Sequence, residues 1–471
     1  DPVRVIDAVI DELRLDNFKK LYKETGRCAY HPKMMLKVII YGYMNNLYSC
    51  RKIESALKRD IHFIWLAGYE QPDHNTINRF RNRVKDEINE VFTQLVLLLS
   101  AKGYVSLDVE YIDGTKIESK ANKYTFVWRK TTETNRSKLI EKIKILLGQI
   151  DDCIAQENTD ELEPQSISPA DLRNLADELN RTLEQQPKPV TKEERKAQRE
   201  KKKQITHLNE HADKLGEYDH KLSKLGERNS YSKTDEDATF MRMKDDYMKN
   251  GQLKAGYNVQ IATEGQYALA YSIFPNPTDT LTLIPFLNKI EQHYFELPKH
   301  IVADAGYGSE QNYNDILSNR KREALITYNL YLKEQKKKYK QNIFNTANWA
   351  YDQAADKYTC PNNQLLHFKY HSVRTDRNGF KREYKIYECE NCTDCPLRSS
   401  CTKAKEGNHR KLMINEKWEQ QKEYVRAKLS DEKTGAIYRK RKIDVEPVFG
   451  FLKANLRFTR FSVRGKLKVE N

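Results

Sequence analysis

Two acidic residues follow apolar, β-prone runs in this chain. Asp113 comes after "VEYI" and precedes Gly114, and Asp304 comes after "HIVA" and lies two residues before Gly306. An acid beside a glycine often does no more than reverse the chain. Two acids in such similar settings have a second explanation, because a carboxylate that ends a strand, next to a glycine that allows close approach, can hold a metal ion or a substrate.

A magnesium site built on these two aspartates would need a third acid. Glu446 in "RKIDVEPVFGFLK" is the candidate, because Lys442 stands four residues before it and Lys453 seven after it, close to the same helical face. In that arrangement the acid completes the metal site and the lysines hold phosphates. Pro447 fits a helix interior poorly, so we expect the helix to start or kink there. A surface glutamate paired with lysines is the alternative interpretation.

The acids need a sheet that brings them together. "KAGYNVQIATEG" and "YALAYSIFPN" are rich in Val, Ile and Tyr and meet at Gly265 and Gln266, which predicts a hairpin. A helix over "LTLIPFLNKIEQHY", a strand ending at Asp304, a helix and a strand over "EALITYN" follow. With the strand that ends at Asp113 in front, this order predicts an α/β, ribonuclease-H-like core with the two aspartates on neighbouring strands. Asp279 precedes the first of these helices and is expected to cap it.

The amino-terminal part of the chain has the pattern of a helical DNA-binding domain. Apolar residues fall at helical spacing up to about residue 102, and Ser49 and Asp73 are expected to cap two short helices in a helix-turn-helix outline. The second helix should turn Ile77, Phe80 and Val84 inward. Asn and Arg read base edges and phosphates, and a solvated helix face is the alternative. The polar residues predicted to share the outer face are Asn75, Asn78, Arg79, Asn82 and Arg83.

The overall charge favours a polyanionic partner. Lys and Arg number 82 against 67 Asp and Glu, which gives a net charge of +15. Nucleic acid is the commonest such partner, and an anionic membrane surface is the rival. No run approaches the ~20 apolar residues of a membrane span. The first residues carry acids where a signal peptide would be basic and then apolar, so we expect a cytoplasmic protein without a membrane partner.

A charged insertion separates the first predicted strand from the hairpin. From about residue 130 to 230, two apolar stripes at helical spacing are followed by long stretches in which charges occupy most faces. This pattern predicts a long helical hairpin, partly coiled-coil. Its basic run is either a solvated face or a surface that lies along DNA.

Seven stretches, in order along the chain, resemble DDE transposases of bacterial insertion sequences, in particular the insertion-sequence family numbered eleven-eighty-two. The resemblance covers nearly the whole chain. It implies that Asp113, Asp304 and Glu446 are the catalytic acids that bind two Mg²⁺ or Mn²⁺ ions, and that Gly114 leaves room for the scissile phosphate. The stretches are "HPKMMLKVIIYGY", "SCRKIES", "PDHNTINRFR", "YIDGTKIESKANKYTFVW", "GYNVQIAT", "VADAGYGSEQNY" and "EPVFGFLKANLRFTRFSVRG".

A looser signature of related transposases, Tyr-Arg-Glu-Lys, falls on Tyr438, Arg441 or Lys442, Glu446 and Lys453. The tyrosine and lysine spacings fit, whereas Arg441 is one residue out of place. With the polar face of the amino-terminal helix, these signature residues complete the predicted set of DNA-contacting residues, which lie in two parts of the chain. These residues are Asn75, Asn78, Arg79, Arg83, Tyr438, Arg441, Lys442 and Lys453.

The implied activity is that of a transposase. Such an enzyme binds the ends of its insertion sequence, cleaves the DNA and joins the 3′-OH ends to target DNA, acting on double-stranded DNA as a homodimer in the bacterial nucleoid. A nuclease of the same fold that does not join strands is one alternative. An inactive, transposase-derived DNA-binding protein is another, although the presence of all three acids argues against it.

The eight cysteines fall into two groups. Cys28, Cys50 and Cys153 sit alone and are expected to be buried thiols. A cytoplasmic protein would not keep the others as disulfides, and their repeated Cys-x-x-Cys spacing predicts a metal site. The clustered residues are Cys360, Cys389, Cys392, Cys395 and Cys401.

Zinc takes four ligands, and this cluster offers five cysteines. The pattern of the resembled family favours Cys360, Cys392, Cys395 and Cys401, with Cys389 as the alternative ligand. An iron–sulfur cluster is the other option for closely spaced cysteines.

The predicted organisation has four parts. An all-α, helix-turn-helix-like DNA-binding domain covers residues 1–104, and the ribonuclease-H-like core covers 105–345, interrupted by the helical insertion at about 130–230. A cysteine-rich insertion at 346–410 precedes the carboxy-terminal region, 411–471, which carries the glutamate.

Overall fold

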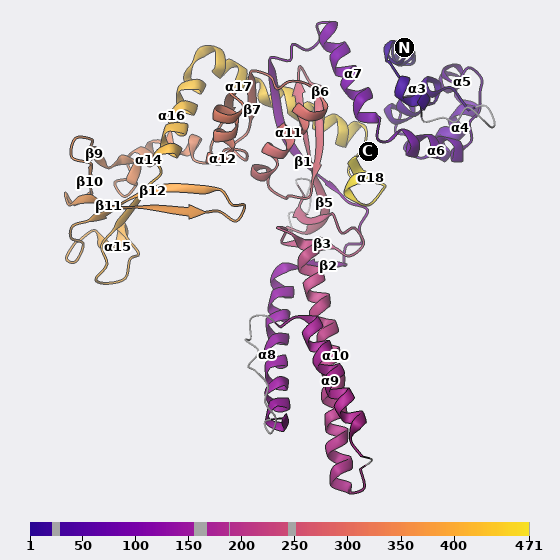
Figure 1. Ribbon diagram of the computed structural model, residues 1–471. Coiled ribbons are helices and arrows are strands. Elements are labelled where there is room, and N and C mark those ends of the chain that lie inside the picture. Colours follow the sequence, from indigo (N-terminus) through magenta and orange to yellow (C-terminus); the bar gives the residue numbers. More distant parts are fainter. Residues whose placement is uncertain (21–28, 155–166, 188, 244–250, 471) are drawn as a thin grey trace.

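The computed structural model describes residues 1–20, 29–154, 167–187, 189–243 and 251–470. A central sheet carries helices on its two faces. A helical arm extends from one end of it, and a second, smaller sheet and a group of helices lie on opposite sides (Figure 1).

The described elements before the central sheet are all helices. Ile77, Phe80 and Val84 are buried in their shared core, as the sequence predicts. Asp73 caps its helix by accepting a hydrogen bond from the Thr76 amide at 2.6 Å, whereas Ser49 makes no side-chain capping bond. The helices are α1 (Pro2–Glu12), α2 (Asp16–Lys20), α3 (Pro32–Met44), α4 (Cys50–Arg59), α5 (Ile61–Leu66), α6 (His74–Val84) and α7 (Ile88–Ala101).

The central sheet has six strands in the order β4-β5-β1-β7-β8, and β6 also pairs with β5. β1 runs antiparallel to β5 and parallel to β7, and β7 runs parallel to β8. The order of elements from β5 to β8 follows the sequence prediction, while the short β4 was not foreseen. The strands are β1 (Val109–Glu118), β4 (Thr239–Arg242), β5 (Leu253–Glu264), β6 (Tyr267–Phe274), β7 (His300–Ala303) and β8 (Glu323–Ile326).

Helices cover the sheet on both faces. One apolar core joins Ile112 and Ala303 to α11 (Leu283–His293), and a second joins Tyr111 and Val302 to α17 (Glu432–Gly450). The face changes between successive residues because side chains alternate along a strand. α12 (Glu310–Asn314), α16 (Glu416–Ser430) and α18 (Lys466–Glu470) complete this part of the fold.

The helix that carries Glu446 does not start at Pro447. α17 continues through Pro447 as far as Gly450, so the expectation of a helix start there was wrong. The residues on either side, Val445 and Phe449, are buried against the sheet, and this packing outweighs the hydrogen bond that proline cannot donate.

The described part of the insertion contains three helices. It leaves and rejoins the core through the antiparallel pair β2 (Phe126–Trp128) and β3 (Ser230–Ser232). α10 (Lys192–Leu225) packs against both α8 (Arg129–Ile154) and α9 (Pro169–Gln185). Figure 1 shows these helices extending away from the central sheet. Only one narrow stripe of α10 is apolar and buried, and the rest of its surface is polar. This explains why the sequence pattern predicted an arm with a solvated surface.

The cysteine-rich region forms a five-stranded antiparallel sheet of its own, in the order β13-β12-β11-β10-β9. The short elements α13 (Tyr331–Glu334), α14 (Lys337–Lys340) and α15 (Arg398–Cys401) lie before it and within it. Its strands are β9 (Ala350–Asp352), β10 (Lys357–Thr359), β11 (Leu365–Thr375), β12 (Lys381–Cys389) and β13 (Lys411–Ile414).

Candidate active site and cysteine cluster

The register of the central sheet brings Asp113 and Asp304 next to each other. Ile112 on β1 is opposite Ala303 on β7, and each aspartate is the next residue along its chain. Asp304 ends its strand as expected. Asp113 does not, because β1 continues to Glu118 while paired with the long antiparallel β5, and only its pairing with β7 stops at this point.

Backbone amides orient both carboxylates. Asp113 Oδ1 accepts a hydrogen bond from the Gly114 amide at 2.7 Å, and Asp304 Oδ1 accepts one from the Gly306 amide at 2.7 Å. Asp113 is buried, and its Oδ2 lies 3.6 Å from Nη1 of Arg441 on α17. The residue whose position in the transposase signature was out of place therefore pairs with the first acid.

Gly114 does not leave open space for a phosphate. A Cβ atom placed on it would lie 2.2 Å from Gln260 Nε2, 2.6 Å from Asp279 Oδ1 and 2.8 Å from Asn258 Oδ1. The expectation was wrong because polar side chains of β5 and of the following segment fill the space above this residue. A glycine is required there because any larger side chain would displace them.

Asp279 is not a helix cap. No side-chain capping bond is made at the start of the short 3₁₀ turn Asp279–Leu281 or of α11. Instead Asp279 Oδ1 accepts hydrogen bonds from Asn258 Nδ2 at 2.7 Å and from Gln260 Nε2 at 3.0 Å. The capping prediction failed because two amides on the neighbouring strand compete successfully for the carboxylate.

A buried tyrosine lies close to three of these acids. Tyr307 is fully buried and donates a hydrogen bond to Gln260 Oε1. Burial, followed by the negative charges of Asp279, Asp113 and Asp304, raises the pKa of Tyr307 well above its ordinary value. The phenol is therefore neutral, and it supports the acidic cluster indirectly, because it donates to Gln260, whose amide donates to Asp279.

α17 crosses β8, β7, β1 and β5 on one face of the sheet. Tyr438 Oη lies 3.0 Å from Thr327 Oγ1, just beyond β8. Asp444 accepts hydrogen bonds from Thr263 Oγ1 at 2.6 Å and from the Gly265 amide at 2.8 Å, at the β5–β6 turn. Glu446, two residues further, is exposed and projects from nearly the opposite side of the helix.

Asp444 was missed by sequence reasoning. It sits two residues before Glu446 in the same motif, and only its burial and partners tell the two acids apart. Its hydrogen bonds fix the rotation of α17. Of the two lysines predicted to share the face of Glu446, Lys442 is exposed and Lys453 is partly buried.

The acids are not gathered into a complete metal cage. Within the described ranges, no group of three or more His, Cys, Asp or Glu side chains is arranged so that it could hold a metal ion. The donor set nevertheless suits Mg²⁺, since it consists of carboxylate oxygens and the buried Asn258 Oδ1, which has no hydrogen-bond partner in the described part of the chain.

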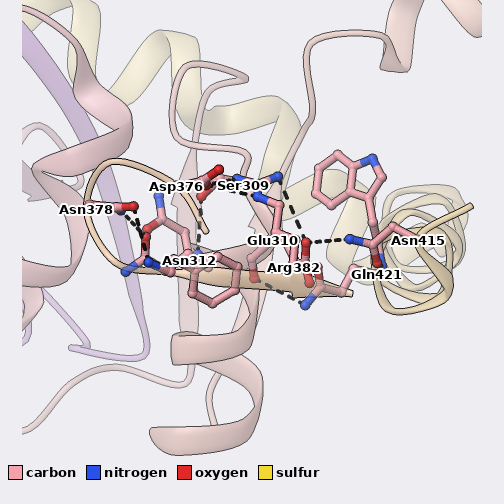
Figure 2. A network of polar contacts seen from close by, with 11 residues as sticks. Ser309, Glu310, Asn312, Asp376, Asn378, Arg382, Asn415 and Gln421 are labelled. Atoms are coloured by element: carbon pink, nitrogen blue, oxygen red, sulfur yellow. Dashed lines mark hydrogen bonds and ion pairs between the residues drawn. The ribbon is translucent and has the colours of Figure 1, made fainter. Parts of the chain in front are cut away.

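α12, which follows Asp304, is tied to the cysteine-rich sheet. Glu310, 2% exposed, lies between Asn415 and Arg382, as Figure 2 shows. Asn415 Nδ2 donates to Glu310 Oε2 at 2.7 Å, and Arg382 Nη1 of β12 is 3.9 Å from the same oxygen. Asn378, in the β11–β12 turn, donates to Gln311 at 2.6 Å.

The same network reaches the acids. Ser309 caps α12 by accepting a hydrogen bond from the Asn312 amide at 3.2 Å (Figure 2). Asn312 Nδ2 then donates to the Tyr307 carbonyl at 2.7 Å and to the Thr280 carbonyl at 3.0 Å. These contacts join the cysteine-rich sheet to the segments that carry Asp304 and Asp279.

Neighbouring thiols influence the ionisation of Cys389 and Cys401. Burial, together with Cys392, raises the pKa of Cys389 to about 12. Burial also raises the pKa of Cys401, with contributions from Cys360, Cys392 and Cys395. Cys360, Cys389, Cys392 and Cys401 pack in one small core with Leu366 and Tyr387, but among the described residues no three cysteines are placed so that they could hold a metal ion.

Two of the sulfurs accept backbone hydrogen bonds. The Gln364 amide lies 3.3 Å from Cys360 Sγ, and the Arg410 amide lies 3.4 Å from Cys392 Sγ. Such bonds stabilise thiolate ligands and fix their orientation. Cys50 is a half-buried free thiol, whereas Cys28 and Cys153 lie outside the residues whose side chains are described.

The proposed DNA-contacting face of α6 is open. Asn75, Asn78, Arg79 and Arg83 are exposed, opposite the buried stripe of the same helix. The α6 side chains therefore form a polar surface at the edge of the molecule. In the part of the chain that the structure describes, no helix is long and apolar enough to cross a membrane.

Two segments of the chain match family models. Residues 359–471 match a model described as a transposase DDE domain, and residues 1–83 match one described as a transposase domain (DUF772). These matches support a DDE transposase. The first includes Glu446 and the cysteine cluster, and the second includes most of α6. No curated protein and no solved structure matches the chain significantly.

Proposed function

We propose that this protein is a transposase of the insertion-sequence family numbered eleven-eighty-two, with a ribonuclease-H-like core and Asp113, Asp304 and Glu446 as its catalytic acids. The observation that carries the proposal is the register of β1 and β7, which makes the two aspartates neighbours beneath the helix that bears the glutamate. The strand order, with antiparallel β5 and parallel β7 on either side of β1, supports the same core. The two family matches give independent support from the ends of the chain.

The acids would hold two Mg²⁺ or Mn²⁺ ions. Bound there, the ions would activate water or a DNA 3′-OH and stabilise the leaving oxygen. The Gly114 and Gly306 amides keep the two aspartates oriented before metal arrives. Arg441 offsets the negative charge of Asp113. The negatively charged carboxylates repel one another. Bound metal ions would reduce this repulsion and allow the acids to come close together.

DNA recognition is assigned to two surfaces. The exposed residues of α6, Asn75, Asn78, Arg79 and Arg83, would contact the ends of the element, with the asparagines reading bases. Lys442 is exposed beside Glu446, and with Tyr438, Arg441 and Lys453 it would serve the DNA at the active site. Enzymes that join two DNA ends work on both at once, so we propose a homodimer on double-stranded DNA, in the bacterial cytoplasm.

The cysteine-rich sheet is proposed to bind zinc through Cys360, Cys392, Cys395 and Cys401, with Cys389 as the alternative fourth ligand. Two observations support this. Four of the five cysteines pack in one small core, and backbone amides donate to the sulfurs of Cys360 and Cys392. An iron–sulfur cluster would use the same sulfurs, and elemental analysis with a labile-sulfide assay separates the two.

End binding provides the first functional test. The protein should bind DNA carrying the ends of its own element, and Arg79→Ala should weaken binding and reduce its dependence on salt, because a lost phosphate contact releases fewer counterions. Arg59→Ala, on α4, provides a matched arginine control. Equal binding of end DNA and unrelated DNA by the wild-type protein would argue for a non-specific nuclease or a DNA-binding relic.

A further inference from the structure

A fourth carboxylate lies at the same end of the sheet as the two neighbouring aspartates. A Cβ atom placed on Gly306 would lie 2.9 Å from Asp304 Oδ1 and 3.6 Å from Asp279 Oδ2, so both oxygens border one small space. On the other side, Asp279 Oδ1 closely covers Gly114, the residue after Asp113. Asp279 therefore lies between Gly114 on β1 and Asp304 at the end of β7.

Uncharged groups orient the side chain of Asp279. Its Oδ1 accepts hydrogen bonds from Asn258 and Gln260, two uncharged amides of β5, and its Oδ2 faces Gly306. Within the described part of the chain, it forms no ion pair with Lys, Arg or His. A carboxylate held in this way presents one oxygen toward Asp304.

Asn258 adds an independent sign of a missing ligand. Its side chain is buried, with 1% exposed, and its Oδ1 has no hydrogen-bond partner among the described residues. This oxygen is one of the polar atoms that cover Gly114, beside Asp279 Oδ1. Buried polar atoms are nearly always paired, so a lone carbonyl oxygen beside carboxylates marks a place for a cation or for a water molecule bound to one.

We propose that Asp279 is a further ligand of the divalent-cation site and that Asn258 Oδ1 receives a cation-bound water beside it. The inference rests on the proposed function, because it extends the site of Asp113, Asp304 and Glu446. It makes the site a set of four acids, in which Asp279 works from the face of the sheet opposite α17. The competing explanation is structural: Asp279 would only tie the segment before α11 to β5.

A calorimetric titration of the full chain with Mn²⁺, in the absence of DNA, separates these explanations. Asp279→Asn keeps the size of the side chain and removes its charge, and it should weaken Mn²⁺ binding by about tenfold or more. Asp113→Asn should do the same. Asp108→Asn, an exposed acid just before β1, is the matched control and should bind Mn²⁺ as the wild type does.

The failure of this inference and the failure of the proposed metal site give different results. Normal Mn²⁺ affinity in Asp279→Asn with a loss in Asp113→Asn would overturn the inference and leave the proposed active site intact. Normal affinity in Asp113→Asn, or no Mn²⁺ binding by the wild type, would count against the proposed metal site itself. Should Asp279→Asn fail to fold, Asn258→Leu replaces it. That variant should bind Mn²⁺ several-fold more weakly, and unaltered binding by folded Asn258→Leu would also overturn the inference.

Discussion

Asp444 determines how the helix that carries Glu446 sits on the sheet. Its carboxylate is buried and accepts hydrogen bonds from Thr263 Oγ1 at 2.6 Å and from the Gly265 amide at 2.8 Å. A third contact, with the Gln266 amide at 3.4 Å, is at the limit of a hydrogen bond and adds little. Replacing Asp444 by alanine should therefore free α17 from the β5–β6 turn.

The size of the effect follows from the two short bonds. A hydrogen bond to a charged group contributes about 1.5–3 kcal/mol. Thr263 is buried and would keep only the Tyr111 carbonyl, 3.4 Å from its Oγ1, whereas Gly265 is exposed and water would replace the carboxylate. We expect Asp444→Ala to destabilise this contact by about 2–3 kcal/mol. Asp444→Asn, which keeps an acceptor oxygen, should cost about 1 kcal/mol.

Hydrogen exchange of backbone amides measures this contact locally. A loss of about 2 kcal/mol corresponds to roughly thirty-fold faster exchange in the β5–β6 turn and along α17. Thr263→Val removes only one bond and should give a smaller increase. Strand transfer should also fall, because a shift of about 1 Å at Glu446 can cost on the order of a hundredfold in rate. Unchanged exchange in Asp444→Ala would refute the anchoring role.

Three further predictions concern other parts of the molecule. Burial raises the pKa of Glu110 from 4.5 to about 8, so its protonated form stabilises the fold at low pH and this stability is lost as pH rises from near 4.5 to about 8. Glu110→Gln should remove this loss of stability with rising pH, measured as melting temperature against pH. If the melting temperatures of variant and wild type change with pH in parallel, the prediction is wrong. Glu310→Ala should lower the free energy of unfolding by about 3 kcal/mol, because it leaves buried partners unpaired. Glu310→Gln should lower it by about 1 kcal/mol. Equal losses in the two variants would show that the carboxylate is not needed. Removal of zinc by a chelator should speed backbone hydrogen exchange in residues 360–401 while the central sheet stays protected. Cys395→Ser should lower the zinc content from about one per chain, whereas the control variant Cys50→Ser should not. Folded, active protein without metal would contradict this last prediction.

Much of the central sheet was predictable because its strands are apolar and its hairpin has a clear turn. The same reasoning brought Asp113 and Asp304 onto neighbouring strands, since each follows a short β-prone run. It could not show that β1 continues past Asp113, because that depends on pairing with β5. Local patterns of polarity carry no information about which distant strand extends a ladder.

Other features were beyond the reach of sequence for related reasons. Asp279 looked like a helix cap because caps are local, whereas its partners Asn258 and Gln260 lie about twenty residues earlier on another strand. Asp444 and Glu446 are indistinguishable by type and spacing, and only packing reveals which is buried. The cysteine-rich sheet gave no strand signal because most side chains of β11 are exposed on both faces.

Strand transfer in vitro tests the central claim most directly. Purified protein, DNA carrying the element's ends, a target plasmid and Mg²⁺ should yield joined products with the wild type and with Asp108→Asn. Asp113→Asn, Asp304→Asn and Glu446→Gln should each lower joining by at least about a hundredfold while end binding persists. Joining that survives loss of any one of these three acids would contradict the proposed active site, and cleavage without joining by the wild type would identify a nuclease instead.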